Sequence, residues 1–392
     1  MPGGSFLEPY KAFSESMGAE VIMVPNLETS SVADQVAWFK HLSAKGALPS
    51  HVELGNEFWV AMGEDPVVLQ RWPDEPTSMR VTRRYLEAIK PYLPNGAKVA
   101  VQAAAPLFHG EPSSRGKMME RLRRWNEDLG PEPWFDAVTI HLYPRLNEVI
   151  GRGAAEDPLT PEIAQRNRRA LLARGDDGTG RQLDDLARRV PGKEVRITEW
   201  NPSGAEGEGE RHRAETTTPA MMLQLVTRMT LTFLRYPQVT VSQYFAVRFK
   251  PDSPKCTFLA AKGGYRAVPM AVALRWLNVA ANGGATYQRL VEAGNPRISG
   301  GGVCQESNAA VEAVIFRGKG RVTLILQNAL DESRSWQVGT ELKLGIPSHV
   351  ERLTAPDLAD STIRIAEVES VSPATNIQFP AYSVTRVVWD KR

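Results

Sequence analysis

The sequence predicts a parallel α/β domain followed by an all-β domain. Up to about residue 282, short apolar runs rich in β-branched residues alternate with longer amphipathic segments, the pattern of repeated βα units. Beyond Gly283, apolar residues recur mostly at every second position, which is typical of strands. A chain of 392 residues also exceeds the size at which one core usually stops growing. We therefore expect two domains, residues 1–282 and 283–392.

Six runs in the first domain have the length and composition of strands. They lie at 20–25, 51–55, 98–102, 135–141, 194–198 and 239–245. A closed (β/α)8 TIM barrel needs eight strands in ~250 residues. The simplest interpretation is a TIM barrel that lacks its first two βα units, so that the six runs correspond to barrel strands three to eight.

Amphipathic segments before and between these runs predict the helices. Residues 7–17 place four apolar side chains on one face, and Ser31 with Asp34 forms a capping box for a helix that Gly46 ends. Further helices are expected over 79–90, 117–129, 219–234 and 268–281. The segment 145–190 predicts an insertion and charged helical pieces separated by the glycine-rich run 175–180.

The second domain predicts a β-sandwich of roughly a hundred residues. Its strands are separated by Gly, Pro, Asn and Asp, and we expect them at 311–316, 321–327, 335–338, 362–365 and 383–389. An incomplete barrel before it would leave strand edges at 21–25 and 239–245 uncovered. A homo-oligomer that covers this edge, a smaller closed barrel, or a longer natural product would each resolve the problem.

Composition bounds the possible partners and cofactors. A net charge of +2, from 47 basic and 45 acidic residues, argues against nucleic acid and membrane surfaces as partners. No run approaches a ~20-residue membrane span and no signal peptide is evident, so we expect a soluble chain of unassigned location. Cys256 and Cys304 lie far apart, and the six histidines never form an HxxxH pair. We therefore predict no metal and no cofactor.

Two motifs end strand-like runs on a glutamate beside aromatic residues. They are Glu53-Leu-Gly-Asn-Glu57-Phe-Trp59 and Val195-Arg-Ile-Thr-Glu199-Trp-Asn201. Two carboxylates at strand ends suit a retaining glycoside hydrolase, in which an acid and a nucleophile ~5 Å apart face one glycosidic bond. Taken singly, either glutamate is more often an ordinary strand end or helix cap. Their joint occurrence in barrel order, with His141-Leu-Tyr-Pro144 between them, favours catalysis.

These residues resemble clan A glycoside hydrolases. In that clan the first glutamate ends barrel strand four as general acid/base and the second ends strand seven as nucleophile, which agrees with our numbering if two strands are absent. Family 51 α-L-arabinofuranosidases are similar at the Glu53–Trp59 motif and at two other segments, Val21-Ile-Met-Val-Pro-Asn26 and Phe379-Pro-Ala-Tyr-Ser-Val-Thr385. Family 39 β-xylosidases and family 79 glucuronidases are similar at His141–Pro144 and Ile197–Asn201.

The predicted catalytic residues are therefore Glu57, as acid/base, and Glu199, as nucleophile. Asn56 could bind the sugar hydroxyl beside the anomeric carbon, a role that the resemblance also implies. We expect supporting roles for His141 and Tyr143. The other predicted substrate-binding residues are aromatic platforms or hydroxyl partners, although packing is the commoner role of a lone tryptophan: Trp59, Trp200, Gln243, Tyr244 and Asn26.

The predicted function is hydrolysis of an oligo- or polysaccharide, with an α-L-arabinofuranosidase preferred. A β-xylosidase, β-glucuronidase or endo-glycanase of the same clan fits almost as well. A catalytically incomplete carbohydrate-binding protein is the alternative of another class, because a missing part of the barrel would open the pocket. Two segments are interpreted without a catalytic role. The arginines of 121–124 predict a solvated helix face, and 201–213 predicts a disordered loop or a lid.

Overall fold

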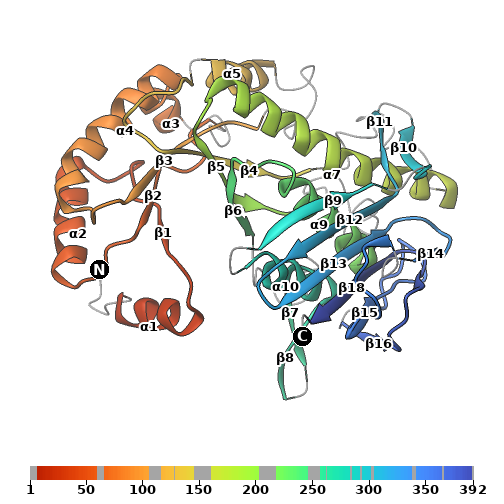
Figure 1. Cartoon of the computed structure of the whole chain (residues 1–392). Helices are drawn as coiled ribbons and strands as arrows, with labels where there is room; N and C mark the ends of the chain where they lie inside the picture. Colours follow the sequence, from red (N-terminus) through yellow and green to blue (C-terminus); the bar gives the residue numbers. More distant parts are fainter. Residues whose placement is uncertain are drawn as a thin grey trace.

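The computed structural model of the chain has two parts, a curled parallel sheet with helices and a group of antiparallel sheets (Figure 1). It describes residues 7–59, 66–105, 116–127, 129–144, 160–202, 218–245, 257–261, 263–282, 285–291, 294–301, 304–337, 341–363 and 366–390. His109, Cys256 and most of the predicted loop at 201–213 lie outside these ranges. No helix within them is both long and apolar enough to cross a membrane.

Six strands form one parallel sheet in the order of the chain, as predicted. They are β1 (Ile22–Met23), β2 (His51–Leu54), β3 (Lys98–Gln102), β4 (Ala137–Leu142), β5 (Glu194–Trp200) and β6 (Val239–Tyr244). The sheet curls into a half-barrel with helices on its outside (Figure 1). Within the described chain β1 pairs only with β2, and β6 only with β5, so the barrel is open between them. The first strand is shorter than the predicted run at 20–25.

The helices begin and end close to their predicted positions. Ser31 caps α2 through the predicted box with Asp34, and Gly46, with a φ of 60°, follows that helix. The helices are α1 (Leu7–Met17), α2 (Val32–Ala44), α3 (Pro66–Arg71), α4 (Glu75–Ile89), η2 (Lys90–Tyr92), α5 (Gly116–Glu127), α7 (Pro161–Arg189), α9 (Pro219–Phe233) and α10 (Pro269–Ala281). Helix α1 leaves Tyr10, Phe13 and Met17 exposed.

The glycine-rich run at 175–180 does not divide a helix, and the prediction of separate pieces is wrong. Residues 161–189 form the single helix α7. A β-carbon on Gly175 would lie 2.4 Å from Leu225 Cδ1 of α9, and one on Gly180 would lie 2.9 Å from the Tyr236 hydroxyl. These two glycines therefore allow α9 and the turn after it to approach the α7 backbone closely, and this packing offsets their low helix propensity.

The antiparallel part contains a six-stranded sheet in the order β16-β15-β18-β13-β12-β9. Two-stranded sheets β7-β8, β10-β11 and β14-β17 accompany it. The predicted strand at 362–365 is not observed at residues 362–363, and its other two residues lie outside the described ranges. The strands are β7 (Phe258–Ala261), β8 (Gly264–Ala267), β9 (Thr286–Leu290), β10 (Arg297–Gly301), β11 (Cys304–Ala309), β12 (Val311–Arg317), β13 (Arg321–Asn328), β14 (Arg334–Trp336), β15 (His349–Leu353), β16 (Glu369–Val371), β17 (Ile377–Phe379) and β18 (Ser383–Asp390).

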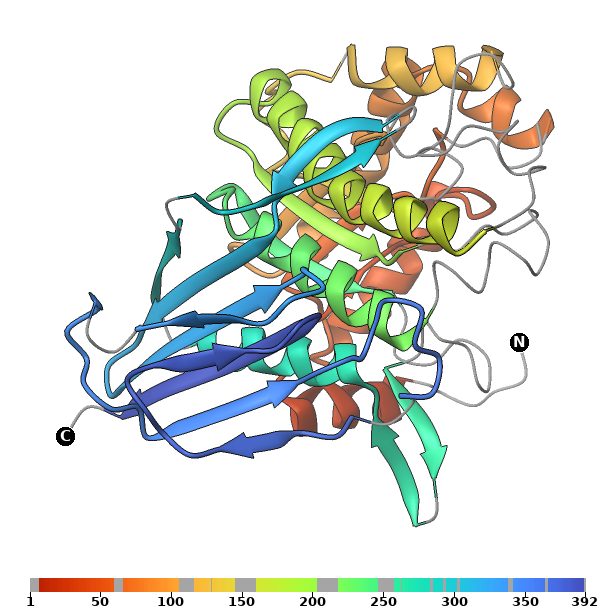
Figure 2. The ribbon, with the colours of Figure 1, turned by 90° about the vertical axis from the view of Figure 1, so that its right-hand side faces the viewer.

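Helices α9 and α10 lie between the two sheets (Figure 2). One face of the six-stranded sheet packs on these helices through residues such as Phe316, Ile325 and Val384. The opposite face packs against Ile377 and Phe379 of β17. The main hydrophobic core also joins residues of the parallel sheet with Tyr382 and other residues of the second part. The two parts therefore share buried contacts.

Candidate active site

The two predicted glutamates lie at the same edge of the half-barrel, at the carboxyl ends of β2 and β5. Glu57 follows β2, whereas Glu199 belongs to the end of β5 and lies opposite His141 of β4 in the parallel register. In barrels of βα units this edge is where active sites are built, because the carboxyl ends of parallel strands converge there. The strand order thus brings together residues that are 142 positions apart, from 57 to 199.

The turn after β2 holds Glu57 in an unusual conformation. Its φ is 51°, in the left-handed region, and Gly55 before it has a φ of 104°. A β-carbon on Gly55 would lie 2.4 Å from the Phe58 ring, so the turn requires glycine there on grounds of space as well. The backbone N–H of Phe58 donates a hydrogen bond to Gln102 Oε1 at 3.2 Å. The turn is therefore fixed to β3.

Arg121 of α5 fixes the same turn from outside the barrel. Its guanidinium donates to the carbonyl oxygens of Phe58 at 2.7 Å and Trp59 at 3.3 Å. It also donates to the carbonyl oxygens of Trp72 and Pro73. Stacking of Phe58 on Trp72, with ring centroids 4.2 Å apart, joins the same two segments. The prediction of a solvated helix face is therefore wrong for Arg121.

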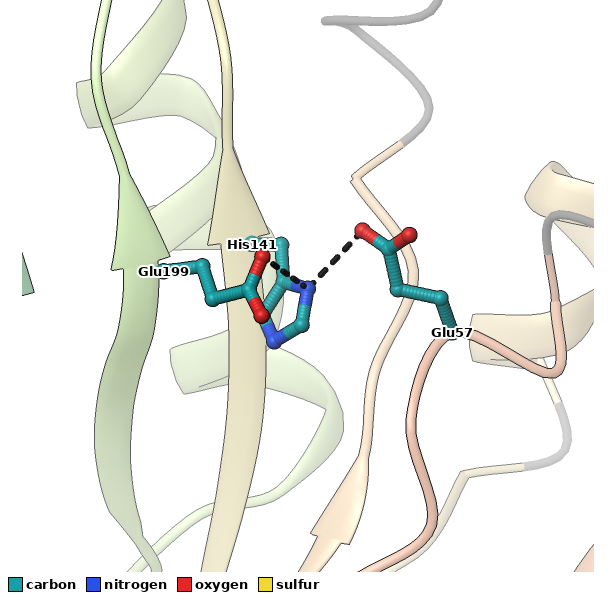
Figure 3. A group of neighbouring side chains, drawn as sticks. All are labelled: Glu57, His141 and Glu199. Carbon is teal, nitrogen blue, oxygen red and sulfur yellow. Dashed lines mark hydrogen bonds and ion pairs between the residues drawn. The ribbon is translucent and has the colours of Figure 1, made fainter. Parts of the chain in front are cut away.

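His141 lies between the two carboxylates (Figure 3). Its Nδ1 is 2.8 Å from Glu57 Oε1 and 3.5 Å from Glu199 Oε2. One oxygen of each glutamate and a ring nitrogen of His141 all lie within 4.8 Å of one another. The Tyr143 hydroxyl donates a hydrogen bond of 2.5 Å to Glu199 Oε2. Both carboxylates are partly exposed, whereas the His141 ring is buried, so a ligand can approach the glutamates.

The charge of His141 follows from its neighbours. Burial by itself disfavours the charged ring, but the carboxylates of Glu53, Glu57 and Glu199 together outweigh burial and raise the pKa of His141 to about 10. His141 is thus an imidazolium at neutral pH, and both ring nitrogens are donors. It can supply positive charge to the two glutamates, whereas removal of a proton from substrate would require it to lose its own first.

Glu57, His141 and Glu199 also have the spacing of a possible metal site, since each offers a ligand-type atom. A metal ligand must be a neutral imidazole. Here Nδ1 is 2.8 Å from Glu57 Oε1, and a bound ion would have to displace the proton that the raised pKa of His141 favours. We assign no ion to this group. The predicted absence of a metal is addressed by experiment below.

Two predicted aromatic platforms do not fit the structure. Trp59 and Trp200 are each 1% exposed, so their rings present no free face to a sugar. Trp200 packs edge-on against Phe233 and Tyr244, with ring centroids 5.0 and 5.2 Å apart. Both tryptophans are core residues that support the strand ends, which is the commoner role of a tryptophan in such a motif.

The other predicted binding residues lie in different surroundings. The Asn26 side chain accepts from the backbone N–H groups of Glu28 and Thr29 and donates to the Thr29 hydroxyl, so it stabilises its own turn. Asn56 is exposed next to Glu57, and Gln243 is exposed on edge strand β6. Tyr244 packs on Trp200 and directs its hydroxyl to Met270 Sδ at 3.3 Å. Of these four, Asn56 is the one adjacent along the chain to a predicted catalytic residue, Glu57.

Three residues of the site were not predicted: Glu53, Gln102 and Arg121. Glu53 was visible as a charged residue inside an apolar strand, which is a recognisable signal because strand β2 is otherwise buried. Gln102 similarly ends a buried strand. Nothing local distinguishes Arg121 from the neighbouring arginines of α5, because its role depends on carbonyl groups about 50 to 60 positions away, as at Phe58 and Pro73.

Comparisons with solved structures show a glycoside hydrolase fold. An arabinofuranosidase superposes with a TM-score of 0.61 at 12% identity, covering 98% of this chain and 79% of its own. An α-L-arabinofuranosidase from Thermotoga maritima gives 0.56 at 11% identity, with 98% and 78% covered. A family 44 xyloglucanase from Paenibacillus polymyxa gives 0.55 at 10% identity, with 95% and 75% covered. By sequence, the chain matches no protein-family model and no curated protein.

These likenesses concern the fold alone, because the identities lie between 10% and 12%. The neighbours are glycoside hydrolases of different specificities, and their barrel architecture agrees with the curled parallel sheet of this chain. The functional assignment must come from the side chains at the strand ends.

Proposed function

We propose that the protein is a retaining glycoside hydrolase in which Glu57 is the acid/base and Glu199 the nucleophile. The observation that carries the proposal is the approach of one oxygen of each carboxylate to within 4.8 Å at the carboxyl edge of the parallel sheet. Retaining enzymes hold their two carboxyl groups ~5 Å apart, whereas inverting enzymes leave roughly 6.5–9.5 Å for a water molecule. The observed separation favours direct attack.

Each carboxylate contacts His141 through one of its oxygens. Tyr143 and His141 both face Glu199 Oε2, which leaves Oε1 to attack the anomeric carbon. Glu57 contacts His141 through Oε1, and we assign its Oε2 to the glycosidic oxygen. In the first step Glu57 gives its proton to the leaving oxygen while Glu199 forms a bond to the anomeric carbon. In the second step Glu57 takes a proton from water, which attacks that carbon and releases Glu199.

We further propose that the substrate is an oligo- or polysaccharide and that α-L-arabinofuranosides are preferred. The resemblance of the Glu53–Trp59 motif to family 51 and the likeness of the fold to two arabinofuranosidases support this choice. Asn56, exposed beside Glu57, is the proposed partner of the hydroxyl next to the anomeric carbon. β-Xylosides, β-glucuronides and internal glycan bonds are the alternative substrates.

The same proposal numbers β1–β6 as barrel strands three to eight and divides the chain at 282/283, with a β-sandwich as the second domain. The open edges at β1 and β6, together with the exposed apolar face of α1, are compatible with the predicted homo-oligomer, which stays a prediction. If this opening leaves the pocket incomplete, the protein would bind carbohydrate without cleaving it, and the experiments below distinguish that outcome.

The test is hydrolysis of aryl α-L-arabinofuranosides, β-D-xylosides and β-D-glucuronides by the wild type and by Glu199→Ala. We expect Glu199→Ala to lose at least about 10⁴-fold in kcat, because it lacks the group that forms the covalent intermediate. Glu87→Ala is the matched control, since it removes an exposed carboxylate of α4 that pairs with Arg83 of the same helix. Activity should persist in a chelator. Binding of these sugars without turnover by the wild type would favour the non-catalytic alternative.

Glu57→Ala tests the second role. An aryl group that leaves without protonation needs no acid, so its first step should survive in this variant, whereas alkyl glycosides should lose at least about 100-fold. The second step should then limit the rate, and added azide should accelerate it by replacing the activated water. Retention is checked by NMR, which should show the product first in the anomeric form of the substrate. Initial formation of the opposite anomer would contradict the retaining mechanism.

A further inference from the structure

Glu53 is a buried carboxylate that the proposed reaction does not use. It lies on β2, four positions before Glu57, and is 2% exposed. Its Oε1 is 3.7 Å from Nε2 of His141. Within the described residues this oxygen has no hydrogen-bond partner at 3.5 Å or less, so the contact with His141 is an ion pair rather than a hydrogen bond. Both nitrogens of the ring thus face carboxylates.

Burial makes this contact energetically important. A carboxylate taken out of water loses several kcal/mol of solvation, which must be offset by a nearby positive charge or by hydrogen bonds. The imidazolium of His141, itself 3% exposed, is the positive group facing Glu53. The interaction is mutual, because the buried ring also needs a nearby anion to remain charged.

The carboxylates around His141 come from two strands. Glu53 and Glu57 approach from β2 and its turn, and Glu199 approaches from β5. Tyr143, which follows β4, contacts Glu199. Glu57 and Glu199 both change charge during the proposed reaction. The proposed reaction uses no atom of Glu53 and therefore leaves its charge unchanged.

We propose that Glu53 is a positioning residue whose buried carboxylate holds His141 as an imidazolium, with Nδ1 directed between Glu57 and Glu199. The inference rests on the proposed function and adds a residue to that site. Its contact with Nε2 fixes the ring from the side opposite the two reacting carboxylates. Nδ1–H is then available to either glutamate without rotation of the ring.

The net charge of these four groups is the same before reaction and in the glycosyl intermediate. Before reaction Glu199 and Glu53 are negative, His141 is positive and Glu57 is protonated, for a net charge of −1. In the glycosyl intermediate the proton of Glu57 has left with the departing group and the negative charge of Glu199 has become an ester bond. Glu57 is then negative, and the net charge is again −1. The imidazolium lies 2.8 Å from one carboxylate and 3.5 Å from the other, so it can stabilise both states.

The direct test is ¹⁵N NMR of the histidine rings across pH 5–11. We expect His141 in the wild type to give imidazolium shifts throughout neutral pH, and its signals are assigned by their loss in His141→Gln. In Glu53→Gln the midpoint of the His141 titration should fall by about one to three pH units. A neutral His141 in the wild type at pH 7, or an unchanged midpoint in Glu53→Gln, would overturn the proposal.

The matched control is Glu20→Gln. Glu20 pairs with another ring, His51, through a 2.8 Å contact between Oε2 and Nε2, and it is exposed. This variant should alter the His51 signals and leave those of His141 unchanged. An equal movement of His141 in Glu20→Gln would show that the effect is a general one of net charge and would contradict a specific role for Glu53.

Kinetics provides the second readout. Glu53→Gln should lower kcat by about 10- to 100-fold with little change in KM, and should shift the pH profile of kcat. Glu53→Asp, which keeps the charge, should recover part of the loss. Circular dichroism verifies the fold of each variant, and the wild-type titration needs no variant at all. Absence of turnover in the wild type would reject the proposed function, whereas the NMR titration would still test the Glu53–His141 pair.

Discussion

For Glu57 the sequence predicts a role but not a backbone conformation. The role, and the partner Glu199, were predicted from two strand-end motifs. The φ of 51° at Glu57 was not, because backbone strain depends on what surrounds the turn. Strained non-glycine residues cluster at functional sites, where neighbouring contacts hold them. Here the contacts come from Gln102 and Arg121, which belong to other βα units.

His141 makes the stability of the protein depend on pH in a defined direction. Its pKa rises from 6.5 to about 10 on folding, so the folded state binds the proton more tightly than the unfolded state. The stabilisation is therefore complete below about pH 6.5 and is lost as pH rises towards 10. Urea unfolding of the wild type at pH 6, 8 and 10 should show this decline. His141→Asn should reduce this decline of stability with pH, whereas His349→Asn, at an exposed histidine, should not. An equal decline in all three proteins would contradict the raised pKa of His141.

Substitution of Arg121 should show that its hydrogen bonds, and not merely its positive charge, stabilise the protein. Arg121→Met removes a guanidinium that donates to four carbonyl groups, those of Phe58, Trp59, Trp72 and Pro73. We expect a loss of about 1–3 kcal/mol in the free energy of unfolding, measured by urea denaturation, and lower activity because the Glu57 turn loosens. Arg124→Met, on the exposed face of the same helix, should change stability by less than about 0.5 kcal/mol. Equal losses of stability in Arg121→Met and Arg124→Met would show that the hydrogen bonds of Arg121 to the four carbonyl groups do not stabilise the turn.

At the scale of elements, the sequence predicted most boundaries within a few residues because strands and caps have local signals. The box at Ser31 and the alternation of β12, β13 and β18 are examples. Helix α7 shows the limit of local reasoning. From the sequence alone, Gly175 and Gly180 predict breaks in the helix. In the structure they lie within α7 and allow α9 and Tyr236 to pack closely against it. That contact joins segments about 50 positions apart.

Gly175→Ala therefore tests whether close packing on Leu225 outweighs the low helix propensity of glycine at this position. An alanine in a solvent-exposed helix would stabilise it by about 1 kcal/mol relative to glycine. Here the added methyl would lie 2.4 Å from Leu225 Cδ1, and we expect a net loss of about 1–3 kcal/mol in thermal or urea unfolding. Leu225→Ala removes the clash, so the double variant should be more stable than the sum of the two single changes predicts. Simple additivity would show that Gly175 does not serve this contact.

At the scale of the whole molecule, the sequence predicted the order of the two parts but not how closely they are joined. Five charged residues link α7 and α9 to β9 and β12, namely Asp176, Arg228, Arg235, Arg289 and Glu312. Such a network cannot be deduced from sequence spacing, since its members are separated by more than 50 positions in several cases. The open edge of the half-barrel, by contrast, was predicted from the strand count, and within the described residues β1 pairs with β2 alone and β6 with β5 alone.

The shared core and this network predict that the two parts unfold together. Glu312 is 1% exposed and contacts Arg289 at 2.7 Å and Arg235 at 3.0 Å. Glu312→Gln keeps the shape but removes the counterion of Arg289, while Arg235 keeps its contact with Asp176, so the free energy of unfolding should fall by about 1–3 kcal/mol. Scanning calorimetry should show one transition in the wild type and one, at lower temperature, in this variant. Glu332→Gln, in an exposed pair with Arg334, should change stability by less than about 0.5 kcal/mol. Two separate transitions in the wild type, with only one displaced by Glu312→Gln, would show instead that the two parts fold independently.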